Sequence, residues 1–181
     1  LEAVLTAADM GLANVARLSI YTTDVDEAMK HFDILGARFG HFINGGWTEA
    51  TDDFPSLNPA NGETLARLSQ ATDEDVNAAV AAARKAQGKW AGLGGHGRAR
   101  HLYAIARLLQ KHARLFAVLE TLDNGKPIRE SRDIDVPLAQ RHFYYHAGMA
   151  QLMEAELPDA EALGVCGQII PWNFPLLMLA W

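Results

Sequence analysis

The residue whose type and position best suit catalysis is Asn173, within the stretch GQIIPWNFPLLMLAW. Its neutral carboxamide follows an apolar β-type run and precedes an apolar helix-type run. A strand-to-helix turn of this kind is where α/β proteins present their sites. There an amide N–H can donate to a developing oxyanion, and removing one such donor typically costs about 2.7–4 kcal/mol of transition-state stabilisation. The alternative is that Asn173 is the N-cap of the following helix, and one geometry can serve both roles.

Cys166 is the single cysteine and therefore a candidate nucleophile. It lies beside Val165 inside the β-type run. Only a thiolate attacks, and a cysteine buried in apolar surroundings stays a thiol. We therefore expect Cys166 to be an inert core residue.

Two further motifs suggest ligand binding, and both are interpreted as structural. The loop at 92–97, GLGGHG, matches G-x-G-x-x-G, but the dinucleotide fingerprint needs a preceding strand and an acidic residue about 20 positions later. Helical patterns flank this loop, so we expect a helix–helix connection.

His142 and His146 have i, i+4 spacing and could share a metal. They lack the Glu of H-E-x-x-H and an evident third ligand, so we expect packing.

The elements that must position Asn173 include two strong helices. Residues 72–91 have an apolar face and begin with a T-x-x-D capping signal, Thr72 and Asp75. Residues 98–122 place apolar side chains at helical spacing. The pair Asn124-Gly125, followed by a proline, is expected to close this second helix.

The remaining elements lead directly to the turn. Residues 128–154 are predicted to be helical, with a kink or restart at Pro137 and Asp135 as a possible new cap. Residues 163–171 are predicted to form a buried strand. Residues 174–181 are then predicted to form an apolar helix with a proline in its first turn.

The first part of the sequence carries weaker signals. Residues 41–69 predict short strands and turns, with Asn44-Gly45 and the Pro59 to Gly62 stretch at the turns. Residues 1–40 are predicted to be an N-terminal arm or an upstream segment of unclear role, with a short helix after Asp24.

Composition narrows the function classes. The 181 residues carry a net charge of −6 and a pI of about 5.6, which argues against a nucleic-acid or anionic-membrane surface. No run of about 18 apolar residues predicts a membrane span, and no signal-peptide pattern is present. A lone cysteine suits a reducing compartment.

Because the sequence starts at Leu1 and stops at Trp181 without a cap, we expect it to be a fragment of a longer reading frame.

Two segments carry a family resemblance. GVCGQIIPWNFPLLMLAW at 164–181 and ETLDNGKP at 120–127 resemble the NAD(P)-dependent aldehyde dehydrogenase superfamily. FINGGW, NPANGE, ATDEDVNAAVAAARKA and YYHAG follow the order of that family. The similarity covers Phe42 to Trp181. It implies an α/β fold in which residues 41–181 are the N-terminal portion of a Rossmann-like cofactor-binding domain, with helices, short strands and an oligomerisation arm.

The resemblance also implies roles for individual residues. Asn173 matches the family's oxyanion donor. The nicotinamide side of the cofactor cleft would be lined by Ile169, Ile170, Pro171 and Trp172. The substrate tunnel would be lined by Phe174, Met178 and Trp181. Where a monovalent cation is bound, Asp123 would be a ligand, together with backbone around Ser56-Leu57.

The implied reaction oxidises an aldehyde to a carboxylic acid with NAD, or with NADP as the alternative, through a cysteine thiohemiacetal. The nucleophilic Cys and the Glu that activates water are expected beyond Trp181, so Cys166 is not the nucleophile and the fragment alone is expected to be inactive. The family implies a cytoplasmic homo-oligomer for the full-length protein. The alternative is a catalytically silent scaffold or assembly module, in which the downstream Cys and Glu would be replaced.

Overall fold

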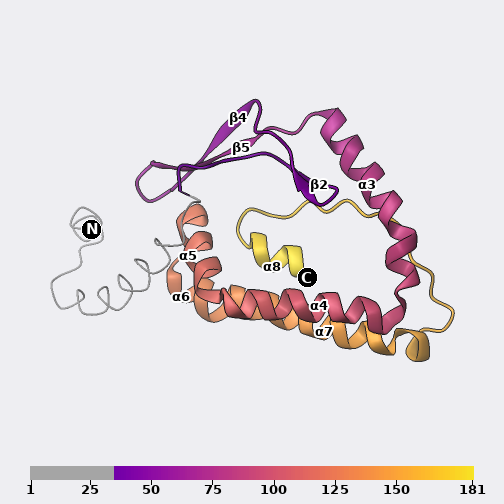
Figure 1. Cartoon of the computed structure of the whole chain (residues 1–181). Helices are drawn as coiled ribbons and strands as arrows, with labels where there is room; N and C mark the ends of the chain where they lie inside the picture. The colour runs from indigo at the N-terminus through magenta and orange to yellow at the C-terminus, as the bar shows by residue number, and fades with distance from the viewer. Residues whose placement is uncertain (1–34) are drawn as a thin grey trace.

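The structure is a computed structural model that describes residues 35–181. The expectations for an arm over most of residues 1–40, and for a helix after Asp24, lie outside the described residues. The expected mixed α/β organisation is confirmed for the described part: short strands come first and helices follow (Figure 1). Within residues 35–181 no helix is long and apolar enough to cross a membrane.

The short strands form a small sheet and a hairpin. β5 (Thr64–Ser69) lies between β1 (Arg38–Phe39), which is parallel to it, and β4 (Asp53–Leu57), which is antiparallel. β2 (Phe42–Ile43) and β3 (Gly46–Trp47) make the hairpin. Its turn residues Asn44 and Gly45 have φ of 54° and 81°, as a two-residue hairpin turn requires. The predicted strands and turns of residues 41–69 are confirmed.

Helix α3 (Asp73–Gly92) begins as the sequence predicts. The Thr72 hydroxyl accepts from the Asp75 N–H while the Asp75 carboxylate accepts from the Thr72 N–H. These hydrogen bonds hold the pKa of Asp75 below its usual value. No side chain of α3 is buried, and Val76 on its apolar face is 54% exposed. The predicted N-terminal cap of α3 is therefore confirmed, and the apolar face of the helix is left largely uncovered by the other described residues.

The expected single helix over 98–122 is instead two helices, which corrects that prediction. α4 (Gly94–Lys111) and α5 (Ala113–Asn124) are separated at His112, whose φ of −108° and ψ of 20° leave the helical region. The break lets each of the two helices pack against a different downstream element. α4 lies along the long helix α7, whereas α5 contacts the turn that precedes α7.

The region around Pro137 contains an irregular turn. After α6 (Ile128–Glu130), a π-helical turn η2 (Ser131–Asp135) leads into α7 (Val136–Glu156). The Val136 N–H donates to the Ser131 carbonyl five residues back, and this wider turn accommodates the proline, which has no N–H to donate. The expected restart is confirmed, but Asp135 is not a cap: its backbone is helical and its side chain caps nothing.

The α4–α7 contact forms the centre of the core and is made of small residues. Ala99, Ala106, Ala139 and Ala147 are fully buried. A Cβ at Gly95 would lie 2.1 Å from the Ala150 carbonyl oxygen, so only glycine permits this approach. The G-x-G-x-x-G loop is therefore a helix–helix junction, as expected, and Gly95 in it serves packing.

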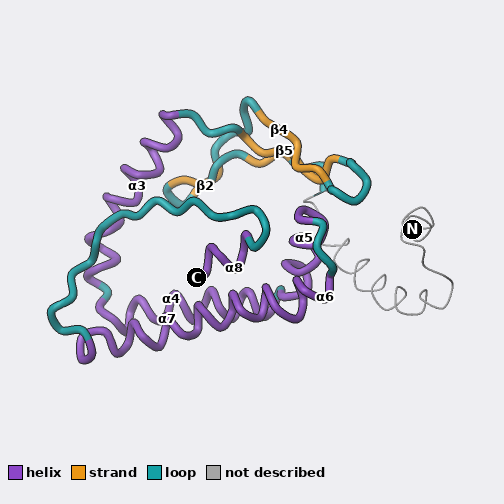
Figure 2. The backbone as a smooth tube through the Cα atoms, turned by 180° about the vertical axis from the view of Figure 1, so that it is seen from behind, coloured by secondary structure: helices purple, strands orange, loops and turns teal. Residues whose placement is uncertain are grey.

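The segment after α7 departs from the prediction of a buried strand. Residues 161–171 contain no strand, and Leu163 is 97% exposed. Figures 1 and 2 show this connection passing beside α3 and the β2 hairpin before it reaches α8 (Pro175–Ala180). A lone strand has no partner for its N–H and C=O groups, and none pairs with it among the described strands. Cys166 is exposed, so the expectation of a buried thiol is wrong for this structure.

Candidate active-site turn

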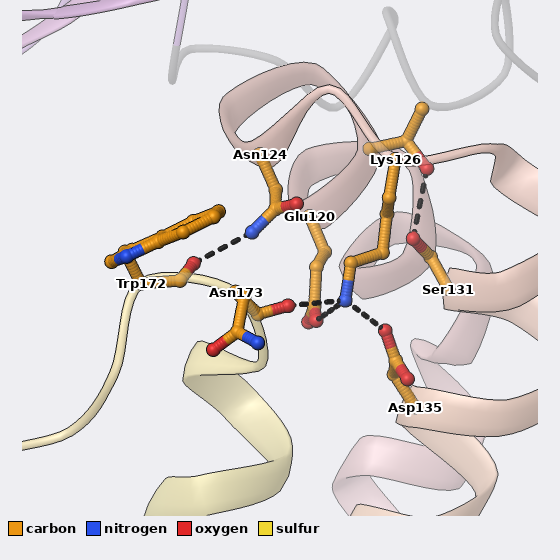
Figure 3. Close-up of polar contacts among 8 residues, drawn as sticks. Glu120, Asn124, Lys126, Ser131, Asp135, Trp172 and Asn173 are labelled. Carbon is orange, nitrogen blue, oxygen red and sulfur yellow. Dashed lines mark hydrogen bonds and ion pairs between the residues drawn. The ribbon is translucent and has the colours of Figure 1, made fainter.

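Lys126, in the loop after α5, lies at the centre of a buried polar cluster (Figure 3). Its Nζ donates to Asp135 Oδ2 at 2.5 Å and to the Asn173 carbonyl at 2.6 Å, and Glu120 Oε1 lies 3.5 Å away. Nζ also lies 4.2 Å from the centre of the Phe174 ring, which is a cation–π distance. The Lys126 side chain is 9% exposed. Each of its three N–H donors therefore has an acceptor.

Glu120 gives this cluster an unusual titration. The pKa of Glu120 is raised to about 7. Burial is the largest cause; Lys126 lowers the pKa, and Asp135 raises it. A desolvated carboxyl next to another carboxylate favours its neutral form. The Glu120 carboxyl therefore keeps its proton to a higher pH than an ordinary glutamate does.

The loop between α5 and α6 has a fixed shape. Gly125 follows the end of α5 with φ of 82°, and its N–H donates to the Thr121 carbonyl at 2.9 Å. A Cβ at this position would also lie 2.6 Å from Pro59 Cγ. Glycine is therefore required here both for the left-handed backbone and for the contact with Pro59. The predicted closure at Asn124-Gly125 is confirmed.

The same loop holds the turn that carries Asn173. Asn124 Nδ2 donates to the Trp172 carbonyl at 2.6 Å, and Lys126 donates to the next carbonyl along the chain, that of Asn173. Figure 3 shows both contacts converging on the turn from the α5 side. Two residues of one loop thus hold two consecutive carbonyls.

The Asn173 side chain is not used as a cap. The N-cap of α8 is Phe174, with no side-chain hydrogen bond, so the N-cap interpretation of Asn173 is wrong. The residue is half-buried, and within residues 35–181 no hydrogen bond engages its carboxamide, whereas its backbone oxygen is bonded (Figure 3). The carboxamide therefore remains available for a ligand.

The residues expected at the cofactor lie on the connection that leads to this turn. Ile169 and Pro171 are exposed, Ile170 is 37% exposed and Trp172 is 82% exposed. Ile170 also lines an apolar cavity of about 420 Å³ between β4, β5, α5 and α8. Together they present an apolar strip next to Asn173.

The residues expected in a substrate tunnel are spread over α8 and its ends. Phe174 packs over the Lys126 ammonium, and Met178 is half-buried. Trp181 stacks on His142, with ring centroids 5.7 Å apart. None of the three lines the apolar cavity beside β4, β5, α5 and α8.

Asp123 is in direct contact with Ser56. The Ser56 hydroxyl donates to the Asp123 carboxylate, and both residues line the apolar cavity. This contact joins the end of α5 to β4. Residues 35–181 contain no group of three or more His, Cys, Asp or Glu side chains that could hold a metal. His142 and His146 stack with ring centroids 6.4 Å apart, and His146 is exposed.

Sequence reasoning did not identify the residues that hold the turn. Asn124 and Lys126 belong to the ETLDNGKP motif, yet no contact with the Asn173 turn was predicted for either of them. One available signal was Glu120. It lies four residues after Phe116, on the same face of the predicted helix. A buried acid requires a partner, and the basic residues nearest to Glu120 along the chain are Arg114 and Lys126, each six positions away.

Comparisons with known proteins identify the family. The sequence model described as "Aldehyde dehydrogenase family" matches residues 47–181. Aldehyde dehydrogenase B of Escherichia coli (strain K12) is 40% identical over 159 residues, which cover 81% of this chain and 31% of that protein. Aldehyde dehydrogenase family 2 member B4, mitochondrial, of Arabidopsis thaliana is 41% identical over 153 residues, which cover 77% of this chain and 28% of that protein.

The structure agrees with the sequence match. An aldehyde dehydrogenase from Bacillus cereus, solved as its NAD+ complex, superimposes with a TM-score of 0.76 at 36% identity, covering 84% of this chain and 34% of that one. The chain thus spans about a third of the length of the relatives that it matches. Because the family model matches well over half of its residues, the chain belongs to the aldehyde dehydrogenase family.

Proposed function

We propose that this chain is part of an enzyme that oxidises an aldehyde to a carboxylic acid with NAD. It would supply the oxyanion donor and part of the cofactor cleft, in the N-terminal portion of the cofactor-binding domain, residues 41–181. The observation that carries the proposal is the state of Asn173. Its backbone is held by Lys126, while its half-buried carboxamide is bonded to nothing within the described residues. Such a fixed backbone with a free N–H donor is what stabilisation of a developing oxyanion requires.

The expected catalytic role of Asn173 is electrostatic. When a nucleophile adds to the aldehyde carbon, negative charge develops on the aldehyde oxygen, and a preorganised N–H donor stabilises that charge more than it stabilises the neutral carbonyl. Asn173 itself forms no covalent bond. The nucleophilic Cys and the Glu that activates water are proposed to lie in the part of the relatives that this chain does not span, so the chain alone is expected to lack turnover.

The exposed strip beside Asn173 fits the proposed cofactor contact. Ile169, Ile170, Pro171 and Trp172 present apolar surface in sequence up to the turn, and a flat, largely apolar nicotinamide face suits such a strip. When bound, NAD would accept hydride from the substrate carbon. The residues of this chain would orient the ring and exclude water from it. The Bacillus cereus structure is an NAD+ complex, which supports NAD; NADP remains the alternative.

Other parts of the proposal follow the resemblance. Phe174, Met178 and Trp181 would line the substrate tunnel. Asp123, with the backbone near Ser56, would contact a monovalent cation. The full-length protein would be a cytoplasmic homo-oligomer with no nucleic-acid partner, and residues 1–40 would be an arm or upstream segment.

The test compares two proteins, this chain and the longer reading frame that contains it. The longer protein should reduce NAD when an aldehyde is added, whereas the chain alone should not. In the longer protein, Asn173→Ala should lower kcat by about 10²–10³-fold, the cost of removing one oxyanion donor. The same change at exposed Asn77 on α3 is the matched control and should leave kcat within about twofold.

Two results would contradict the proposal. Turnover by the 181-residue chain alone would show that the nucleophile lies within this chain. A longer protein without aldehyde turnover, and without the downstream Cys and Glu, would favour a catalytically silent scaffold.

A further inference from the structure

The turn that carries Asn173 is held by the loop 124–126, which approaches it from a distant part of the sequence. Asn124 donates to the Trp172 carbonyl, and Lys126 donates to the Asn173 carbonyl, each at 2.6 Å. The Trp172 carbonyl belongs to the peptide before the Asn173 Cα, and the Asn173 carbonyl belongs to the peptide after it. The two bonds therefore fix the peptides on both sides of this Cα, because rotation of either peptide would break its bond. The Asn173 side chain leaves the backbone between these two peptides, so its direction depends on both contacts.

The Lys126 contact is rigid because its donor is buried and fully used. The ammonium is shared by Asp135, Glu120 and the Asn173 carbonyl. Asp135 is 1% exposed and belongs to the π-helical turn at the start of α7. Water has little access to replace any of these acceptors. The position of the Asn173 backbone is therefore tied to α5 and α7 rather than to the exposed connection that precedes it.

A purely structural explanation accounts for only part of this arrangement. An ion pair of Lys126 with Asp135 and Glu120 would stabilise the helices without any contact to residues 172–173. The structure instead directs one ammonium N–H to the Asn173 carbonyl, and a second residue of the same loop, Asn124, bonds the neighbouring carbonyl. The Phe174 ring, the next residue in sequence, lies against the same ammonium. Three consecutive residues at the turn thus contact this loop.

We propose that Asn124 and Lys126 are positioning residues that hold the two peptides on either side of Asn173, so that the Asn173 carboxamide is directed at the reacting oxygen. This inference rests on the proposed function for its catalytic part. The contact itself can be tested without any activity. Neither residue is expected to touch substrate or cofactor.

The first experiment measures the contact directly by NMR of the 181-residue chain. Trp172-Asn173 is the single Trp-Asn pair and Asn173-Phe174 the single Asn-Phe pair in the sequence. Carbonyl-¹³C Trp with ¹⁵N Asn, or carbonyl-¹³C Asn with ¹⁵N Phe, therefore gives one carbonyl signal per sample. A carbonyl that loses a hydrogen bond moves upfield. Lys126→Met should move the Asn173 signal upfield, and Asn124→Ala should move the Trp172 signal.

Matched controls separate the contact from the substitution. Lys111→Met at an exposed lysine and Asn77→Ala at an exposed asparagine should leave both carbonyl signals in place. Lys126→Met leaves two buried carboxylates without a cation, so it is the variant most at risk of unfolding. Asn124→Ala leaves that cluster intact and keeps the experiment informative if Lys126→Met does not fold.

The second experiment measures kinetics in the longer reading frame. A misplacement of about 1 Å in an active site costs about 10²-fold in rate, so Lys126→Met should lower kcat by about 10- to 100-fold and Asn124→Ala by up to about 10-fold. The KM for NAD should change less than about twofold in both, because neither residue contacts the cofactor. A merely structural role would lower the amount of folded enzyme and leave kcat per folded molecule unchanged.

The outcomes distinguish this inference from the proposed function. Unchanged carbonyl signals in both variants would overturn it. Shifted signals with kcat equal to that of the controls would show that the loop is structural only. A longer protein with no aldehyde turnover would overturn the proposed function and the catalytic part of this inference, while the carbonyl signals would still decide whether the loop holds the turn.

Discussion

At the scale of single residues, three charged side chains in the described part of the chain are buried together. Lys126 lies between Asp135 and Glu120, and all three are largely removed from water. A buried carboxylate is tolerated only when a cation or hydrogen bonds compensate for lost hydration. Burial raises the pKa of Glu120 most, and Lys126, which also pairs with Asp135, lowers it only in part, so that it lies at about 7.

This titration predicts how stability depends on pH. The folded pKa of Glu120 lies above the value of about 4.3 expected when unfolded, so between these pH values the folded state binds more protons. The free energy of unfolding should therefore fall as pH rises through this window, by at most about 1.4 kcal/mol per pH unit for one proton. Glu120→Gln, which cannot titrate, should show a flatter profile in urea unfolding measured from about pH 5 to 8. Glu130→Gln, at an exposed glutamate, controls for the substitution, and parallel profiles for wild type and Glu120→Gln would contradict the assignment.

At the scale of elements, glycine allows the closest helix contact. α4 and α7 approach so closely at Gly95 that its Cα faces the Ala150 carbonyl. Buried alanines continue the same contact along both helices. A close backbone approach of this kind maximises packing between two helices that have few large buried side chains to offer.

Two glycine substitutions should therefore have opposite effects. Gly95→Ala places a Cβ 2.1 Å from a backbone oxygen and should lower the free energy of unfolding by about 1–3 kcal/mol, as overpacking does. Gly88→Ala lies within α3, where a Cβ meets nothing within 4 Å, and should raise it by about 0.5–1 kcal/mol through helix propensity. Chemical denaturation of both variants checks the prediction. Equal effects of the same sign would show that the α4–α7 contact is looser than described.

At the scale of the whole molecule, apolar surface remains uncovered. The apolar face of α3 and the connection after α7 expose Val76, Trp90, Leu163 and Ile169. The chain spans about a third of the length of its relatives. We interpret the exposed connection as a strand whose neighbours belong to the part of the relatives that this chain does not span.

A substitution in that connection tests the interpretation. Leu163→Ser should change the stability of the 181-residue chain by less than about 0.5 kcal/mol, because the side chain is 97% exposed. In the longer reading frame, where the segment would be a buried strand, the same change should cost about 2–4 kcal/mol. Thermal unfolding of both pairs provides the comparison. An equally small effect in the longer protein would refute the buried-strand interpretation.

The sequence was sufficient to predict the features that depend on neighbours along the chain. These include the capping box at Thr72, the hairpin turn at Asn44-Gly45 and the helix end at Gly125. It also determined the family, through PWNFP and LDNGKP. Each depends on backbone preferences or hydrogen bonds within a few residues, and short-range chemistry is fully present in the sequence.

The remaining features depend on contacts that form only in the folded molecule. The break at His112, the role of Asp135 as a partner of Lys126, and the contact between loop 124–126 and the Trp172–Asn173 turn all depend on residues distant in sequence. The same holds for the 163–171 segment, since a strand exists only when another strand bonds to it. The local residue pattern of this segment favours an extended backbone. Whether the extended backbone forms a strand depends on a second strand that can hydrogen-bond to it.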